Sequence, residues 1–302
     1  MERFLTLLSL YLLLSIPASA DQIYKYKDQK GNWIFTDRKP TKDIEVETIK
    51  KTSSKLTKSK PKIYTLTDDK VNYIFAQNPY YAPIEVQLKI KFSENVDRVF
   101  TTVVPSNSKF KLYESNEEID KYYYTWVMGS PETLAKSYTY RLPISSLQDH
   151  RITQSFNGRF SHHQRPNKYA VDIAMPIGTY IGAAREGTVI WVKDDYHMGG
   201  AKEYFLDKAN YVSVLHEDGT YATYAHILQG TALVKPGDKV KSGDRLARSG
   251  SSGFSTGPHL HFVIRKNIGM STVSIPFQFI GEDDEPFTPK RGMTVFSPPE
   301  EI

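Results

Sequence analysis

The chain of 302 residues contains no cysteine. This absence excludes disulfide bonds, catalytic thiolates and zinc sites built on cysteine. Any metal ion that the protein holds therefore needs histidine and carboxylate ligands. All eight histidines lie at or after position 150, so such a site takes its imidazoles from the second half of the chain.

A strong excess of one charge is also absent. The 39 lysines and arginines outnumber the 34 acidic residues only slightly, which leaves a formal net charge of +5. This excess suits an anionic surface or polymer. No segment interleaves basic and aromatic residues as nucleic-acid modules do, so we expect no nucleic acid partner. After residue 20 no apolar run reaches the length of about 20 residues that a membrane span needs.

The first 20 residues have the pattern of an export signal. Arg3 supplies a basic start, residues 4–16 are mostly apolar, and residues 18–20 form a small-x-small cleavage site. We therefore predict that residues 1–20 are a signal peptide. The mature protein is then periplasmic or secreted, with no stable membrane insertion. An uncleaved anchor is the alternative.

Two short segments follow the predicted signal. In residues 23–37, aromatic and β-branched residues alternate with polar ones around a turn with Gly31, which predicts a hairpin in a small β module over residues 21–49. Residues 21–40 resemble a short module that is common at the mature N-terminus of exported proteobacterial proteins. Residues 50–62 are rich in lysine, serine and threonine, and we predict a basic linker there.

Residues 63–148 are predicted to form a β-sandwich-like domain. Segments of strand length, such as residues 84–92 and 99–104, alternate or run apolar, and turn residues separate them at the spacing of a sandwich. No cluster of catalytic residue types occurs here. The expected role of this domain is to position or cover its neighbour.

From residue 149 onward, short strand patterns alternate with glycine-rich turns. Residues 211–215 and 221–225 flank Glu217-Asp218-Gly219, which is a strong hairpin signal. Residues 234–246 have the pattern of a compact, turn-rich ribbon. No stretch of useful length has helical periodicity, so we expect an all-β protein.

The most informative segment is residues 257–262, with the sequence GPHLHF. Side chains alternate between the two faces of a β-strand, so His259 and His261 are expected on one face and Leu260 and Phe262 on the other, toward a core. A strand with one apolar face and two imidazoles on the other is suited to hold a metal or to carry out acid–base chemistry.

Three further positions are candidates to join this pair: His162-His163, Asp172 and His226. A catalytic zinc typically takes three protein ligands and keeps a fourth position for water, and a His–Asp–His set suits it. The metal lowers the pKa of its bound water to about 7 and polarises a substrate carbonyl. Histidines beside the metal can then accept the proton or stabilise the oxyanion.

Residues 151–266 resemble the lysostaphin- and LytM-type zinc metallopeptidases, which cut peptide bonds in bacterial peptidoglycan. The resemblance is carried by residues 152–159 (ITQSFNGR), residues 171–179 (VDIAMPIGT), residues 224–226 (YAH) and above all residues 250–262 (GSSGFSTGPHLHF). It implies a zinc-dependent endopeptidase that hydrolyses peptide cross-links of peptidoglycan. Peptidoglycan is then its partner, with regulatory envelope proteins as further candidates.

The resemblance also implies roles for single residues. Asp172 and His261 would be zinc ligands. His226 and His259 would be catalytic histidines that do not bind the metal.

For the fold, the resemblance implies a C-terminal antiparallel β-sheet peptidase groove, preceded by the sandwich-like domain and the small N-terminal hairpin module. Residues 149–270 would be the zinc metallopeptidase domain and residues 271–302 a C-terminal extension.

The sequence departs from the family pattern at one ligand. The first histidine ligand usually stands four residues before the aspartate, and Lys168 occupies that position here. His162 and His163 are the nearest replacements. We favour His162 because it directly follows residues 159–161, which look like a strand. The remaining histidines, His150, His197 and His216, are assigned to the surface or to turns.

Two alternatives to a peptidase remain. A catalytically inactive relative would bind the cell wall and activate other hydrolases, and Lys168 favours that reading. A carrier domain is suggested by residues 234–246, although no convincing modifiable lysine lies at the tip of this ribbon. The sequence does not determine which residues contact substrate or which cross-link is cut. It also does not determine whether the N-terminal β region inhibits, or the oligomeric state.

Overall fold

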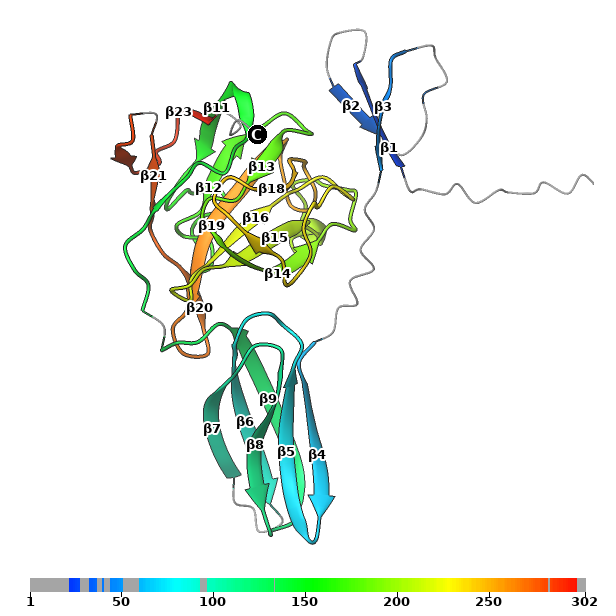
Figure 1. Cartoon of the computed structure of the whole chain (residues 1–302), viewed down its shortest axis with the longest axis vertical. Helices are drawn as coiled ribbons and strands as arrows, with labels where there is room; N and C mark the ends of the chain where they lie inside the picture. Colours follow the sequence, from blue (N-terminus) through cyan, green and yellow to red (C-terminus); the bar gives the residue numbers. More distant parts are fainter. Residues whose placement is uncertain are drawn as a thin grey trace, which may run out of the picture. The chain divides into compact units, whose positions relative to one another are not determined.

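The computed structural model describes residues 22–27, 33–36, 40, 44–50, 60–92, 97–132, 134–281 and 283–297. The chain divides into two compact units at residue 50, and the first contains three antiparallel strands (Figure 1). Strand β1 (Gln22–Lys27) pairs with β2 (Trp33–Thr36) and with β3 (Glu47–Lys50). The first pairing confirms the strands of the predicted hairpin. The predicted signal peptide and residues 51–59 of the predicted linker lie outside the described residues.

The second unit begins with two three-stranded antiparallel sheets. The first has the order β4 (Lys62–Asp68), β5 (Val71–Asn78), β8 (Ser108–Ser115), and the second has the order β7 (Asp97–Val104), β6 (Ile84–Phe92), β9 (Ile119–Met128). Alternate residues of β6, among them Val86, Leu88 and Ile90, are fully buried, as the period of two in their sequence predicts. They pack with Ile74 and Ala76 of β5 in one hydrophobic cluster, so the two sheets form a sandwich.

A nine-stranded sheet forms the main body of the second unit. Eight of its strands follow one another in the order β17 (Lys239–Val240), β14 (Gly187–Lys193), β15 (Tyr211–Leu215), β16 (Tyr221–Ala225), β19 (His259–Asn267), β12 (Val171–Ala174), β11 (Ser146–Gln154) and β23 (Thr294–Ser297), and β20 (Thr272–Ser274) pairs with β19. Every pairing in this sheet is antiparallel.

Two small sheets cover one face of the large sheet. They are β10 (Thr139–Tyr140) with β21 (Gln278–Ile280) and β22 (Pro286–Phe287), and β13 (Tyr180–Gly182) with β18 (Arg245–Arg248). Between the layers lies a large apolar core, which contains Leu260, Phe262 and Ile264 of the central strand β19. The only helical element of the described residues is a 3₁₀ turn, η1 (Glu203–Phe205). The predicted all-β fold class is therefore confirmed.

The sandwich and the large sheet share buried contacts. Ile190 of β14 and Tyr221 of β16 belong to the hydrophobic cluster of the sandwich. The buried carboxylate of Glu85 in β6 accepts hydrogen bonds from Asn267 Nδ2 at 2.7 Å and from the Met270 amide at 2.6 Å. Since this core crosses from one part to the other, the boundaries predicted for residues 63–148 and 149–270 stay predictions.

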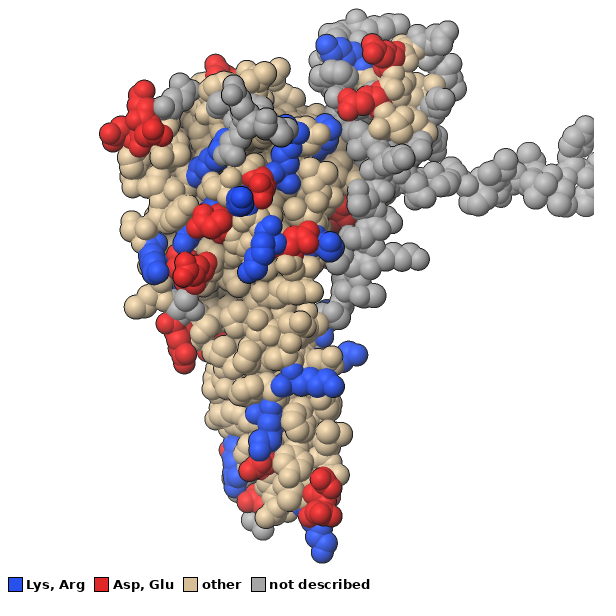
Figure 2. Space-filling model, in the orientation of Figure 1, with Lys and Arg blue, Asp and Glu red and all other residues tan. Residues whose placement is uncertain are grey.

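The described surface carries both charges. Over much of the visible face of the second unit, basic and acidic side chains are intermixed (Figure 2). Within the described part of the chain, no helix has the length and apolar character that a bilayer crossing requires.

Of the histidines assigned to the surface or to turns, His150 lies inside β11, so its assignment was wrong. His216 lies at the predicted hairpin turn, as expected, but like His150 it is only 2% exposed. Nδ1 of each ring hydrogen-bonds a backbone carbonyl, that of Ala174 for His150 and that of Glu186 for His216, whereas Nε2 of each ring is buried without a hydrogen bond. His197 is exposed, as expected.

The burial of His216 predicts a loss of stability in mild acid. Burial lowers the pKa of His216 to about 4, from an ordinary value of 6.5. Between these two pH values the unfolded chain binds a proton on this imidazole and the folded chain does not, so stability falls as the pH falls through this window. The full effect of this one group is about 3 kcal/mol.

We expect the substitution His216→Gln to reduce the slope of stability against pH between pH 6.5 and 4. The measurement is urea unfolding of the chelator-treated protein at a series of pH values. His197→Gln, at the exposed histidine, is the matched control and should leave the slope unchanged. Equal slopes for the two variants would contradict the prediction.

Candidate metal centre

The register of two central strands brings the first pair of candidate residues together. Asp172 of β12 stands directly opposite His261 of β19, and the next residue pair on that face is Ala174 with His259. Leu260 and Phe262 point to the other face, where they are fully buried in the core. The predicted division of this strand into an imidazole face and an apolar face is therefore confirmed.

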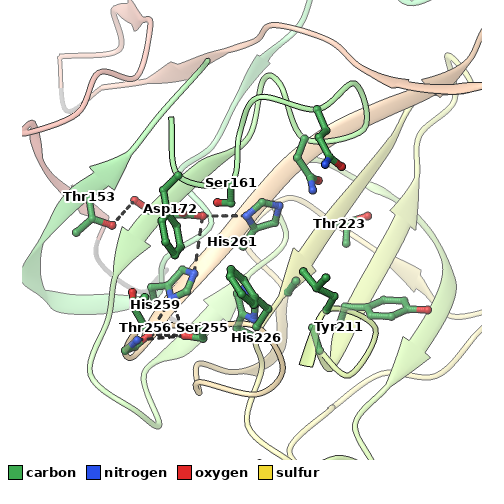
Figure 3. A pocket seen from close by; sticks show the side chains of 18 of the residues that line it. Thr153, Ser161, Asp172, Tyr211, Thr223, His226, Ser255, Thr256, His259 and His261 are labelled. Carbon is green, nitrogen blue, oxygen red and sulfur yellow. Dashed lines mark hydrogen bonds and ion pairs between the residues drawn. The ribbon is translucent and has the colours of Figure 1, made fainter. Parts of the chain in front are cut away.

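Three side chains from distant segments meet at one point. His261 Nδ1 lies 2.9 Å from Asp172 Oδ1. A dashed line marks this contact in Figure 3. His162 Nε2 lies 3.2 Å from the same oxygen. All three residues are buried, and one possible ligand atom of each lies within 4.8 Å of those of the other two. Among the described residues this is the one group of histidine and carboxylate side chains with the spacing of a metal site.

His162 reaches this point from a turn. Residues 159–161 are not a strand, as the sequence analysis supposed, but part of a tight turn in which the His162 amide donates to the Gly158 carbonyl at 3.0 Å. Nδ1 of His162 hydrogen-bonds the Ser155 carbonyl at 3.0 Å. A carbonyl only accepts, so Nδ1 carries the proton and Nε2 keeps its lone pair. That Nε2 is buried and makes no hydrogen bond, so its lone pair is free for a metal.

The neighbouring candidates for the first ligand lie elsewhere. His163 is exposed and lies on the wall of the groove, outside the three-residue group. Lys168 is exposed as well, and its backbone carbonyl accepts a hydrogen bond from the Asn157 amide at 2.7 Å. The chain thus brings His162, and not His163, to Asp172.

Gln154 is a site residue that the sequence analysis missed. Its Nε2 donates to Asp172 Oδ2 at 2.9 Å and to Ser161 Oγ at 2.7 Å, and its Oε1 accepts from the Phe160 amide at 3.2 Å. It therefore fixes the Asp172 carboxylate and ties the turn that carries His162 to the sheet. A Cβ on Gly158 would come within 2.4 Å of the Gln154 side chain, so the turn also needs its glycine. The sequence offered one signal for Gln154, which directly precedes Ser155-Phe156 in residues 152–159, the first of the motifs that carry the family resemblance.

His226 and His259 lie side by side next to this group. Their ring centroids are 4.5 Å apart, and the His226 ring is 5.8 Å from that of His261. His226 follows the last residue of β16 with φ at +65°, a left-handed conformation that is uncommon for a residue with a side chain. Its Nδ1 donates to the Ser252 carbonyl at 2.7 Å, and His259 Nδ1 donates to the Gly257 carbonyl at 2.8 Å. Nε2 of each ring is therefore the nitrogen that keeps a lone pair.

Burial sets the charge of these groups. Burial lowers the pKa of His226 to about 3, and the nearby imidazoles of His259 and His261 contribute to this shift. Burial also lowers the pKa of His261, although Asp172 opposes it. Burial alone would raise the pKa of Asp172, but the imidazoles of His162 and His261 outweigh it and hold the pKa well below its usual range. Near pH 7 the site thus contains the ionised carboxylate of Asp172 and the neutral imidazoles of His226 and His261.

The site opens into a groove with a volume of about 710 Å³. Asp172, His226, His259 and His261 line one part of it. The groove continues over Tyr211 and Thr223, which lie on the far side of His261 from Thr153 in Figure 3. Such an arrangement can hold a cation, transfer protons and accommodate an extended chain.

The comparison with protein families gives two matches. Residues 166–272 match peptidase family M23. Residues 10–62 match a domain of unknown function, DUF4124. The first match includes Asp172 and the histidines at 226, 259 and 261, but it begins after His162.

Three relatives illustrate the similarity. An uncharacterized metalloprotease of Haemophilus influenzae is 36% identical over 152 residues, which make up 48% of this chain and 29% of the relative. The peptidoglycan DD-endopeptidase ShyA of Vibrio cholerae is 30% identical over 159 residues, 50% of this chain and 33% of the relative. Lysostaphin of Staphylococcus simulans is 34% identical over 114 residues, 37% of this chain and 21% of the relative.

This chain thus spans a third or less of the length of these relatives. The resemblance to lysostaphin- and LytM-type peptidases is confirmed, and residues 166–272 form a domain of peptidase family M23.

Proposed function

We propose that this protein is an exported, zinc-dependent endopeptidase that hydrolyses peptide cross-links of bacterial peptidoglycan. One observation carries the proposal. The ligand atoms of His162, Asp172 and His261 converge within 4.8 Å of one another, and Asp172 and His261 line a groove together with His226 and His259. A groove that only binds a polymer has no physical need for four imidazoles around one carboxylate.

The donor set fits zinc. Two imidazoles and one carboxylate are ligands that zinc accepts in catalytic sites. The unpaired, buried Nε2 of His162 is a further sign, because a buried polar atom without a hydrogen bond is costly unless a cation or another partner engages it. When bound there, zinc would supply Lewis acidity, which polarises a carbonyl and lowers the pKa of a coordinated water.

The other two histidines have the properties of proton-transfer groups. Backbone carbonyls hold Nδ1 of His226 and of His259, so that Nε2 of each is the basic nitrogen. In peptide hydrolysis a water oxygen forms a bond to the carbonyl carbon, the C–N bond breaks, and one proton of the water passes to the departing amine. A neutral imidazole can accept that proton and return it to the nitrogen, and a protonated one can stabilise the oxyanion.

The substrate and the location are inferred from relatives and from the N-terminal segment. ShyA is named a peptidoglycan DD-endopeptidase, and ALE-1 of Staphylococcus capitis is named a glycyl-glycine endopeptidase. We propose a peptide bond of peptidoglycan as the substrate here. The predicted signal at residues 1–20 would deliver the protein to the envelope, where this polymer and regulatory envelope proteins are found.

The adjacent histidines 162 and 163 allow a sharp test of the metal site. We expect His162→Ala to lower zinc affinity by more than about 100-fold, because removal of a metal ligand costs more than removal of a group that only hydrogen-bonds to a ligand. His163→Ala is the matched control and should keep one zinc per chain. Zinc content after dialysis and titration against a chelator provide the measurement. If both variants and the unaltered protein bind no zinc, the inactive, wall-binding alternative replaces this proposal.

Gln154 is expected to stabilise the metal site through its hydrogen bond to the proposed ligand Asp172. The substitution Gln154→Leu removes the hydrogen bonds to Asp172 and to the turn of His162, and should lower zinc affinity by about 10- to 100-fold. Gln148→Leu, at an exposed position of the same strand, is the control. The same chelator titration measures both variants. Unchanged affinity in Gln154→Leu would show that Asp172 needs no such partner.

His226 should be needed for turnover but not for zinc. We expect His226→Asn to reduce the digestion of purified sacculi by about 10²- to 10⁴-fold with zinc content intact, since general acid–base groups contribute rate factors of this size. Asparagine suits the test because it tolerates positive φ. His197→Asn is the control at an exposed histidine. Soluble muropeptides released over time are the readout, and full activity of His226→Asn would refute the catalytic role.

A further inference from the structure

Arg265 lies in the groove on the same strand as the metal centre. It follows His261 by four residues on β19, so both side chains belong to the same face, and both line the groove. Tyr211 of β15 and Thr223 of β16 line the same part of the groove. This part has no role in the metal centre, so it is available to bind another portion of the substrate.

The hydrogen bonds of Arg265 all go to neutral groups. Nε donates to the Pro166 carbonyl at 2.8 Å, Nη1 to Thr223 Oγ1 at 3.3 Å and Nη2 to Asn167 Oδ1 at 2.5 Å. A guanidinium has five N–H donors, so two remain for a ligand. Among the described residues, none has a carboxylate within ion-pair distance of Arg265.

The charge of Arg265 is thus uncompensated in a partly desolvated place. Burial lowers the pKa of this guanidinium, and only the phenols of Tyr221 and Tyr211 oppose that effect. A guanidinium still keeps its charge in proteins. Holding residues 166 and 167 explains two of its three hydrogen bonds, and the third goes to Thr223, but a neutral side chain could serve that purpose. A desolvated cation is costly unless an anion pairs with it, so the groove favours an anionic ligand at this position.

We propose that Arg265 is the carboxylate-binding residue of the groove, and that the preferred substrate is a peptide with a carboxylate near the scissile bond. This inference rests on the proposed function. The guanidinium fork matches a carboxylate, to which it can donate two parallel hydrogen bonds. About 13 Å of strand separates the Cα atoms of His261 and Arg265, so the carboxylate lies within about four residues of the bond that is cut.

The test compares three forms of one cross-linked peptide as substrates. One form has all carboxylates free, one is amidated on the side-chain carboxylates, and one is amidated at the C-terminus. We expect kcat/KM of the zinc-loaded protein to fall by about 10- to 100-fold when the recognised carboxylate becomes an amide. The form that loses rate identifies whether a side chain or a chain end is bound.

Variants separate recognition from a structural role. Arg265→Gln should lose the preference for the carboxylate yet keep hydrolysis of the amide form, and Arg265→Lys should restore part of the preference. Arg151→Gln, at an exposed arginine, should behave like the unaltered protein. Equal losses of Arg265→Gln on all three peptides would assign only a structural role and overturn the inference.

A binding measurement keeps the two proposals distinct. If the unaltered protein hydrolyses none of the peptides, the proposed function fails. Calorimetric titration of the same peptides then still decides the inference, because tighter binding of the carboxylate form must disappear in Arg265→Gln. Thermal unfolding of each variant verifies that the fold is intact.

Discussion

The pairing of β12 with β19 is the constraint on which the site depends. Because side chains alternate along a strand, a slip of one residue would move Asp172 and His261 from the groove into the core. Leu260 and Phe262 prevent that slip, since they are fully buried and would be driven into the groove by it. The apolar core therefore fixes the geometry of the polar face. Leu260 and Phe262 thus position the polar side chains of the site, although they take no part in its chemistry.

The electrostatics of the centre follow from burial on this scaffold. The carboxylate of Asp172 keeps its charge because imidazoles and the Gln154 amide surround it. The imidazoles of His226 and His261 stay neutral because they are desolvated. A cluster of one anion and several neutral donors attracts a cation without the need for a second carboxylate. Backbone carbonyls hold Nδ1 of His162, His226 and His259, so that Nε2 of each ring keeps its lone pair.

Local sequence patterns predicted much of the fold and part of the candidate site. The alternation around His259 and His261 and the hairpin at residues 217–219 follow from the period of a strand and from turn chemistry, which neighbouring residues determine. The burial of His216 and the hydrogen bond of Gln154 to Asp172 depend on residues far away in the sequence, so no local pattern fixes them. The turn at residues 159–161 is held by the nearby residues Gln154 and Gly158, and the pattern there was misread as a strand. His162 was chosen over His163 on the expectation of a strand. The structure brings His162 to Asp172 through a turn instead, so the choice agrees with the geometry although its reason was wrong.

One strand links the two parts of the second unit. β19 begins at His259 beside the candidate metal centre and ends at Asn267, whose amide donates to the Glu85 carboxylate of the sandwich, and its nine residues span roughly 27 Å. The sandwich is therefore packed against the sheet that carries the candidate site as a fixed part of the same unit. An evolutionary exchange of this module for another by recombination would leave Ile190 and Tyr221 without their apolar cover. The two parts are thus constrained to diverge together.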